Sequence, residues 1–163
     1  MSQVIVDGFA FCRQAEQREG SAAVAELPRL AAETFNQQGA VHWSFRGGRH
    51  PKDYAQLNMA VTGDVALVCQ RCLLPMSHAI DTQTRLVLAH DEQEADAIEQ
   101  TLDDDAIDVI VGSATLDLMQ LVEDEVLLSL PLSPRHPTCP DGGAAHTPDK
   151  PDSPFAVLQK LKK

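Results

Sequence analysis

Three segments of the chain alternate apolar and polar residues, and this pattern limits the possible folds more than any other feature. The segments cover residues 39–47, 54–68 and 76–90. Because successive side chains of a β-strand point to opposite faces of a sheet, such alternation is typical of strands that bury one face. Turn-forming stretches separate the segments, so we expect an antiparallel meander, with a turn at Gly47-Gly48 and a bulge at Gly63-Asp64.

Shorter elements are expected around this meander. The sequence predicts a strand at residues 3–11, a short helix at 28–35 and an edge strand at 107–111. The clearest helix covers residues 115–131, where Thr115 can cap the N-terminus and Pro131 ends the helix. Its broad apolar side would pack across the sheet. Its polar side is expected to carry Asp117, Gln120, Glu123 and Asp124.

Charge is unevenly distributed along the chain. The formal net charge is -11, yet residues 1–85 hold eight basic and eight acidic side chains. Thirteen acidic residues follow between Asp91 and Glu125, and no Lys or Arg lies between Arg85 and Arg135. Such a block repels nucleic acid and usually lies in solvent. We therefore predict an acidic loop at residues 91–106, which either keeps the chain soluble or meets a basic partner such as a ribosomal protein.

Together these elements predict an α+β fold, in which one main helix packs a small curved antiparallel sheet within a single domain at residues 1–132. Residues 133–163 are rich in Pro, Gly and Asp, so we expect an extended tail with a short helix at its end. The N-terminus has no basic region before an apolar stretch, and no run of about 18 apolar residues is present to span a membrane. A cytoplasmic location without membrane contact is expected.

The cysteines point to a metal site. Cys69 and Cys72 form a C-x-x-C pair at the end of a predicted strand, and His136 and Cys139 form an H-x-x-C pair directly after the main helix. Zinc favours four thiolate or imidazole ligands in tetrahedral geometry, and each pair can supply two. Three alternatives to zinc stay open: a redox pair, buried thiols without a role, or a histidine that merely lies in a loop. Cys12 is isolated and is expected to be buried.

The remaining motifs are weak. The basic residues Arg46, Arg49, Lys52 and Arg71 could contact the phosphates of RNA, although the first three belong to a predicted turn of a kind that more often meets only solvent. The sequence has no Gly-rich phosphate loop, no nucleophile elbow and no zinc-protease motif. No nucleophile is paired with a base, so we expect neither an enzyme nor a small-molecule substrate.

Three segments of the chain resemble the bacterial YceD family, which is named for a large ribosomal RNA subunit accumulation protein. They are GDVALVCQRCLLPMSH at residues 63–78, LDLMQLVEDEVLLSLPLSPRHPTC at 116–139 and SPFAVLQKLK at 153–162. The resemblance implies a role in the synthesis, processing or stability of 23S rRNA, and it implies no catalytic residue.

The resemblance also bears on the metal ligands. Cys69, Cys72 and Cys139 match cysteines of the family. His136 is the expected fourth ligand, with Asp141 or His146 as alternatives.

These features predict a non-enzymatic ribosome-biogenesis factor with a structural zinc site, which binds precursor rRNA or a basic ribosomal protein. Two alternative functions stay open. One is a thiol oxidoreductase that uses Cys69 and Cys72, and the other is a protein-interaction module whose acidic segment binds a basic partner. Metal content would separate the first alternative from the main prediction, and sensitivity of partner capture to ribonuclease would separate the second.

Overall fold

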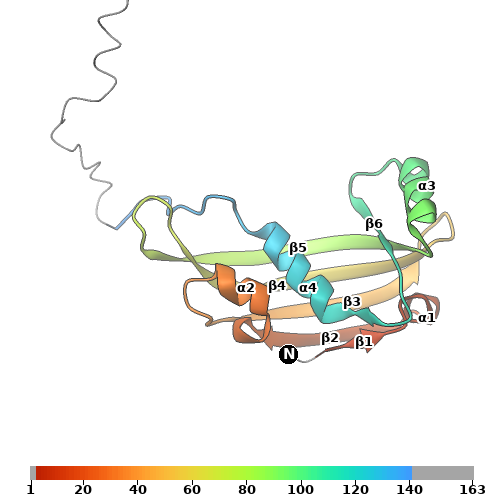
Figure 1. Ribbon diagram of the computed structural model, residues 1–163, viewed down its shortest axis with the longest axis horizontal. Helices are drawn as coiled ribbons and strands as arrows, with labels where there is room; N and C mark the ends of the chain where they lie inside the picture. Colours follow the sequence, from red (N-terminus) through yellow and green to blue (C-terminus); the bar gives the residue numbers. More distant parts are fainter. Residues whose placement is uncertain (1–2, 141–163) are drawn as a thin grey trace, which may run out of the picture.

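The computed structural model describes residues 3–140. Their main element is a five-stranded sheet in the order β2–β3–β4–β5–β6 (Figure 1). Neighbouring strands from β2 to β5 run antiparallel, whereas β6 pairs parallel to β5. The sheet confirms the predicted meander and the edge strand at residues 107–111. Its strands are β2 (Gln17–Ala23), β3 (Ala40–Arg49), β4 (Ala55–Val68), β5 (Pro75–Ala89) and β6 (Ile107–Val111).

Most helices lie on one face of this sheet. α2 (Pro28–Glu33) and α4 (Leu118–Ser129) lie over it, α1 (Gly8–Arg13) packs against β3 and β4, and α3 (Glu92–Leu102) lies at one end (Figure 1). A short 3-10 helix, η1 (Val24–Glu26), precedes α2, and β1 (Ile5–Val6) pairs with β7 (Leu116–Asp117) in a separate small sheet. The architecture is the predicted α+β fold. Within residues 3–140, no helix is long and apolar enough to cross a membrane.

Alternate residues of the central strands form the core. Val41 of β3 and Val61 of β4 are fully buried, in one apolar cluster with Val122 and Val126 of α4. Removing such aliphatic side chains from water is the main favourable term in folding. The period-two pattern therefore predicted the buried face of these strands correctly, and Cys12 is buried in the same cluster as expected.

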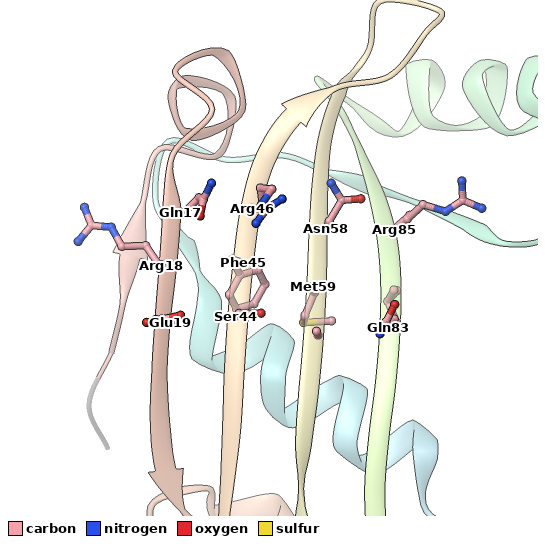
Figure 2. A pocket seen from close by; sticks show the side chains of 12 residues that line it. Gln17, Arg18, Glu19, Ser44, Phe45, Arg46, Asn58, Met59, Gln83 and Arg85 are labelled. Carbon is pink, nitrogen blue, oxygen red and sulfur yellow. The ribbon is translucent and has the colours of Figure 1, made fainter.

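The opposite face of the sheet carries polar side chains. Gln17, Arg46, Asn58 and Arg85 lie side by side on it across four strands (Figure 2). Within the described residues, α3 covers one end of this face through a small apolar cluster with β5 and β6. The rest of the face is left to solvent by the elements between residues 3 and 140.

Two predictions about the strands need correction, and one strand was not predicted. Gly47 and Gly48 continue β3, and the hairpin turn follows at residues 50–53. A side chain at Gly47 would collide with the backbone of Phe11 in α1, so this glycine permits close packing rather than a turn. The Gly63-Asp64 pair keeps regular register with β5 and forms no bulge. β2 was not predicted, because its sequence, QREGSAA, does not alternate apolar and polar residues.

α1 and α4 both begin at aspartates that were not predicted as caps. Only the first part of the segment at residues 3–11 is a strand, because Asp7 starts α1 by accepting a hydrogen bond from the Ala10 N–H at 2.9 Å. Asp117, rather than Thr115, caps α4 and accepts a hydrogen bond from the Met119 N–H at 2.9 Å. An aspartate at this position satisfies N–H groups that have no partner inside the helix.

The segment expected to be an acidic loop, residues 91–106, contains α3. Asp91 caps this helix by accepting a hydrogen bond from the Glu94 N–H at 2.8 Å. Ala95 and Ile98 are buried against β5 and β6. Apolar residues on one side of the helix are enough to order it, and the acidic side chains take the solvent side.

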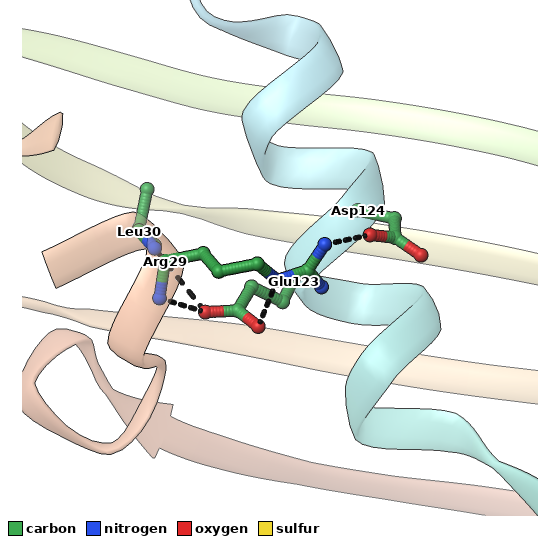
Figure 3. A network of polar contacts seen from close by, with 4 residues as sticks. All are labelled: Arg29, Leu30, Glu123 and Asp124. Atoms are coloured by element: carbon green, nitrogen blue, oxygen red, sulfur yellow. Dashed lines mark hydrogen bonds and ion pairs between the residues drawn. The ribbon is translucent and has the colours of Figure 1, made fainter. Parts of the chain in front are cut away.

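A buried carboxylate joins α4 to α2. Glu123 was expected on the polar side of α4, but it is only 1% exposed. Its carboxylate accepts hydrogen bonds from the N–H groups of Arg29 and Leu30 at 2.7 and 3.2 Å, and from the Arg29 guanidinium at 2.9 Å (Figure 3). The same guanidinium also contacts Asp124 at 2.6 Å. Glu123 thus satisfies N–H groups in the first turn of α2, where a helix has no internal acceptors.

We predict that Glu123→Ala lowers the free energy of unfolding by about 2–4 kcal/mol, because it leaves buried N–H groups of α2 without an acceptor. Urea unfolding followed by circular dichroism measures this loss. Asp124→Ala is the matched control, since its half-exposed ion pair contributes less than about 1 kcal/mol. Equal losses in the two variants would contradict the role assigned to Glu123.

Candidate metal centre

Cys69 and Cys72 lie in the turn between β4 and β5. The Cys69 N–H donates to the Leu74 carbonyl at 3.0 Å, and the Leu73 N–H donates to the Cys69 carbonyl at 2.9 Å. Leu73 has a left-handed backbone conformation, with φ of 61°, which reverses the chain within few residues. The tight turn brings the two thiols, separated by only two residues, close to the same point.

The H-x-x-C pair reaches this turn through a proline-rich segment after α4. Residues 131–140 form neither helix nor strand. The Pro134 carbonyl accepts a hydrogen bond from the Gln70 N–H at 2.8 Å, and the His136 N–H donates to the Cys69 sulfur at 3.4 Å. These two bonds hold the segment against the β4–β5 turn. The remainder of the predicted tail, including its short C-terminal helix, lies outside the described residues.

The four expected ligands lie together. The sulfur atoms of Cys69, Cys72 and Cys139 and a ring nitrogen of His136 are all within 4.8 Å of one another. Cys72 Sγ and His136 Nδ1 are 3.3 Å apart. Sulfur ligands around a tetrahedral zinc ion lie about 3.8 Å apart, because the Zn–S bond measures about 2.3 Å. The cluster could therefore bind a metal ion with small side-chain movements.

His136 is oriented by its second ring nitrogen. Nε2 lies 3.2 Å from the carbonyl oxygen of Pro75. A carbonyl oxygen can only accept a hydrogen bond, so this contact assigns the proton to Nε2 and leaves a lone pair on Nδ1, the atom next to Cys72. Metal-binding histidines commonly donate their other N–H in this way. His136 thus fits the fourth ligand position, whereas the alternatives Asp141 and His146 lie outside the described residues.

Ionised thiolates in this cluster would repel one another. Burial disfavours the charged form of Cys69, but N–H donors of Cys72, His136 and Arg71 outweigh this effect and lower its pKa to about 5. For Cys139, burial together with the hydrogen bonds and charges of Cys72 and Cys69 raises the pKa to about 11. Like charges this close disfavour joint ionisation. A divalent cation would relieve the repulsion, because it binds thiolates and displaces their protons.

The four basic residues predicted to contact RNA do not come together. Arg46 lies on the polar face of the sheet (Figure 2). Arg49 and Lys52 lie at the β3–β4 hairpin, where both contact nearby oxygen atoms. Arg71 lies in the β4–β5 turn, at the other end of β4. They therefore form no single basic patch, and their contact with RNA stays a prediction.

Sequence reasoning missed two backbone groups that shape the candidate metal centre. The carbonyl of Pro75 orients the His136 ring, and the carbonyl of Pro134 anchors the segment that carries it. Every residue has a carbonyl, so composition gives no signal for these acceptors. The prolines themselves were the available hint, because a residue without an N–H can interrupt regular pairing near a ligand.

Comparison with known proteins identifies a matching family model. Residues 57–162 match the model described as large ribosomal RNA subunit accumulation protein YceD. The match covers more than half of the 163 residues and contains the β4–β5 turn, α4 and the segment that follows it. No solved structure matches the chain. All four residues of the candidate metal centre therefore lie within the matched region.

We predict that the wild-type chain binds one Co²⁺ ion and develops the visible absorption of tetrahedral thiolate coordination. Cys69→Ser, Cys72→Ser and Cys139→Ser should each weaken binding by more than about 100-fold, since losing even an outer partner of a metal ligand typically costs about 10- to 100-fold. Absorbance titration of the reduced chain measures both effects. Cys12→Ser is the matched control, because Cys12 is a free, buried cysteine of the apolar core. Unchanged Co²⁺ spectra in the three cluster variants would exclude this centre.

Proposed function

The chain belongs to the YceD family, and we propose that it is a non-enzymatic ribosome-biogenesis factor that supports the accumulation of 23S rRNA in the cytoplasm. The observation that carries this proposal is the match over residues 57–162 to a family described by large ribosomal RNA subunit accumulation. The described surface adds no constellation that argues for catalysis. The partner of the protein would be precursor rRNA of the large subunit or a basic ribosomal protein.

The proposed cofactor is one structural zinc ion. Three cysteines and one histidine would form a closed set of four protein ligands, whereas catalytic zinc sites keep one position for water or substrate. Bound zinc would supply a cross-link between the β4–β5 turn and the segment after α4. The role of Cys69, Cys72, His136 and Cys139 would then be to hold these two parts of the chain together.

Two features favour zinc over the thiol oxidoreductase alternative. Cys69, the thiol whose pKa is lowered, is fully buried and Cys72 is only partly exposed, whereas the attacking thiolate of a redox pair must meet its substrate in solvent. The Cys69–Cys72 pair also lies between two antiparallel strands, whereas thioredoxin-like pairs follow a strand of a βαβ unit. The lowered pKa of Cys69 fits a metal thiolate as well as it fits a nucleophile.

The acidic interaction module remains a second candidate because of α3. This helix has Glu92, Asp96 and Glu99 exposed on its solvent side. A row of carboxylates can attract a basic ribosomal protein. Capture of such a protein that survives ribonuclease treatment would favour this candidate over direct RNA contact.

We predict that a chelator removes the metal without unfolding the sheet, because the apolar core is complete without the centre. Far-UV circular dichroism should stay unchanged, while amide hydrogen exchange should increase at residues 69–74 and 131–140. Cys69→Ser should show the same local exchange before any chelator is added. Global loss of the circular dichroism signal on chelation would contradict the prediction.

We predict that a strain without this gene has a lower ratio of 23S to 16S rRNA and fewer large ribosomal subunits. Quantitative RNA gels and sucrose-gradient profiles measure the two effects. A plasmid copy of the wild-type gene should restore both, and the Cys12→Ser copy should do so equally well. Normal 23S rRNA and normal subunit profiles in the deletion strain would overturn the proposed function.

A further inference from the structure

The polar face of the sheet is hollow. The hollow measures about 750 Å³ and lies over β2, β3, β4 and β5, on the side opposite α4 (Figure 2). Strand register builds its central row, because Gln17 lies opposite Arg46, Arg46 opposite Asn58, and Asn58 opposite Arg85. One row of side chains therefore crosses four strands and alternates amide and guanidinium groups. We call these four residues the cross-strand row.

The hollow is basic although the chain is acidic. Among the side chains that face it, Arg46 and Arg85 are basic and only Glu19 is acidic, while the chain as a whole carries a net charge of -11. Two arginines in one concave surface focus a local positive potential. Arg18 borders the hollow only with its backbone, because it lies opposite the buried Phe45 and its side chain pairs with Glu16. The acidic segment that follows β5 offers no such positive potential to an anionic ligand.

Arg46 and Arg85 are available to bind a ligand. Arg46 makes no ion pair or side-chain hydrogen bond with the described residues. Arg85 lies 3.8 Å from Asp104, and its side chain is 48% exposed. An exposed pair at that distance contributes little, so a phosphate could replace the carboxylate at small cost. Arg46 and Arg85 would therefore lose no strong internal contact on binding a ligand.

The shape and chemistry suit a strand of nucleic acid. Adjacent strands lie about 4.8 Å apart, so Arg46 and Arg85 stand about 10 Å apart, in reach of successive phosphates of one chain. Asn58 and Gln17 carry both donors and acceptors, which can meet base edges or 2′-hydroxyl groups. Trp43 and Phe45 of β3 are buried in the core on the other side, so base stacking on them is not available.

We propose that the hollow binds a single-stranded segment of RNA, with Arg46 and Arg85 contacting phosphates and Asn58 and Gln17 contacting bases or riboses. The proposal rests on the proposed role in 23S rRNA accumulation and names the surface that would serve it. Guanidinium groups bind phosphate through paired hydrogen bonds, and phosphate contacts position RNA without reading its sequence. This mode predicts binding with little sequence preference and strong salt dependence. Of the four basic residues predicted from the sequence to contact RNA, the proposal keeps Arg46 and assigns no contact to Arg49 and Lys52, whose side chains already pair with Asp53 and the Thr101 carbonyl.

Fluorescence anisotropy of the full chain with a labelled, mixed-sequence single-stranded RNA of about 15 nucleotides tests the proposal. Arg46→Gln combined with Arg85→Gln should weaken binding about tenfold and reduce the slope of log K against log salt by about 1.4, or about 0.7 for each lost phosphate contact. Asn58→Ala should weaken binding with the slope unchanged. Circular dichroism should stay unchanged in both variants, since the altered side chains are not part of the core.

Arg49→Gln combined with Lys52→Gln is the matched control, because it removes the same charge from the hairpin instead of the hollow. This control should stay within about twofold of wild type. Equal losses in both double variants would overturn the proposal, as would a wild-type chain that does not bind the RNA. A poly-glutamate peptide is the second probe. If the variant with Arg46→Gln and Arg85→Gln loses binding to the peptide but keeps binding to the RNA, the surface is assigned to an acidic protein and the proposal is overturned.

A test in cells distinguishes failure of the RNA-binding proposal from failure of the proposed function. The Arg46→Gln and Arg85→Gln copy should fail to restore 23S rRNA in the deletion strain, while the hairpin variant should succeed. Full restoration by the copy with Arg46→Gln and Arg85→Gln would overturn the proposal that this surface binds RNA, and would leave the proposed function intact. Normal 23S rRNA in the deletion strain itself would instead overturn the proposed function.

Discussion

The pairing of β4 with β5 runs without interruption from Ala55 opposite Leu88 to Val68 opposite Pro75. This long hairpin determines where the other parts of the molecule can lie. At its closed end, the turn holds Cys69 and Cys72. At its open end, β5 continues into α3 and then into the parallel strand β6. Because one face of the hairpin is apolar and the other polar, the same pairing also separates the helix-covered core from the cross-strand row.

Much of this arrangement could be predicted from local patterns. The period-two alternation located β3, β4 and β5, and the spacing of Cys69, Cys72, His136 and Cys139 identified residues that do lie together. What the patterns could not predict depends on contacts between distant segments. β2 has no alternation of its own and is a strand because β3 offers it a partner along its whole length. The ordering of residues 131–140 likewise depends on a turn formed far earlier in the chain.

Two errors came from giving composition more weight than periodicity. Acidic residues dominate the segment at 91–106, yet Ala95 and Ile98 have the three-residue spacing of a buried helix face. Glu123 was placed with its polar neighbours, although it lies four residues after Met119 and three before Val126, both buried. Helical spacing alone would have put this carboxylate on the buried side. Its partners, the first N–H groups of α2, were not visible from the sequence of α4.

The buried position of Glu123 also restricts how α4 can sit on the sheet. An apolar helix face formed largely by Leu, Val and Met would pack almost as well if it slid by one turn, about 5.4 Å, along the same surface. Such a shift would carry the Glu123 carboxylate away from Arg29 and the first turn of α2, and would leave a charge buried without a partner. That penalty is several times larger than the loss of a few apolar contacts. One acidic side chain therefore restricts α4 to a single position along the sheet. It thereby also fixes the point from which the chain returns toward the β4–β5 turn.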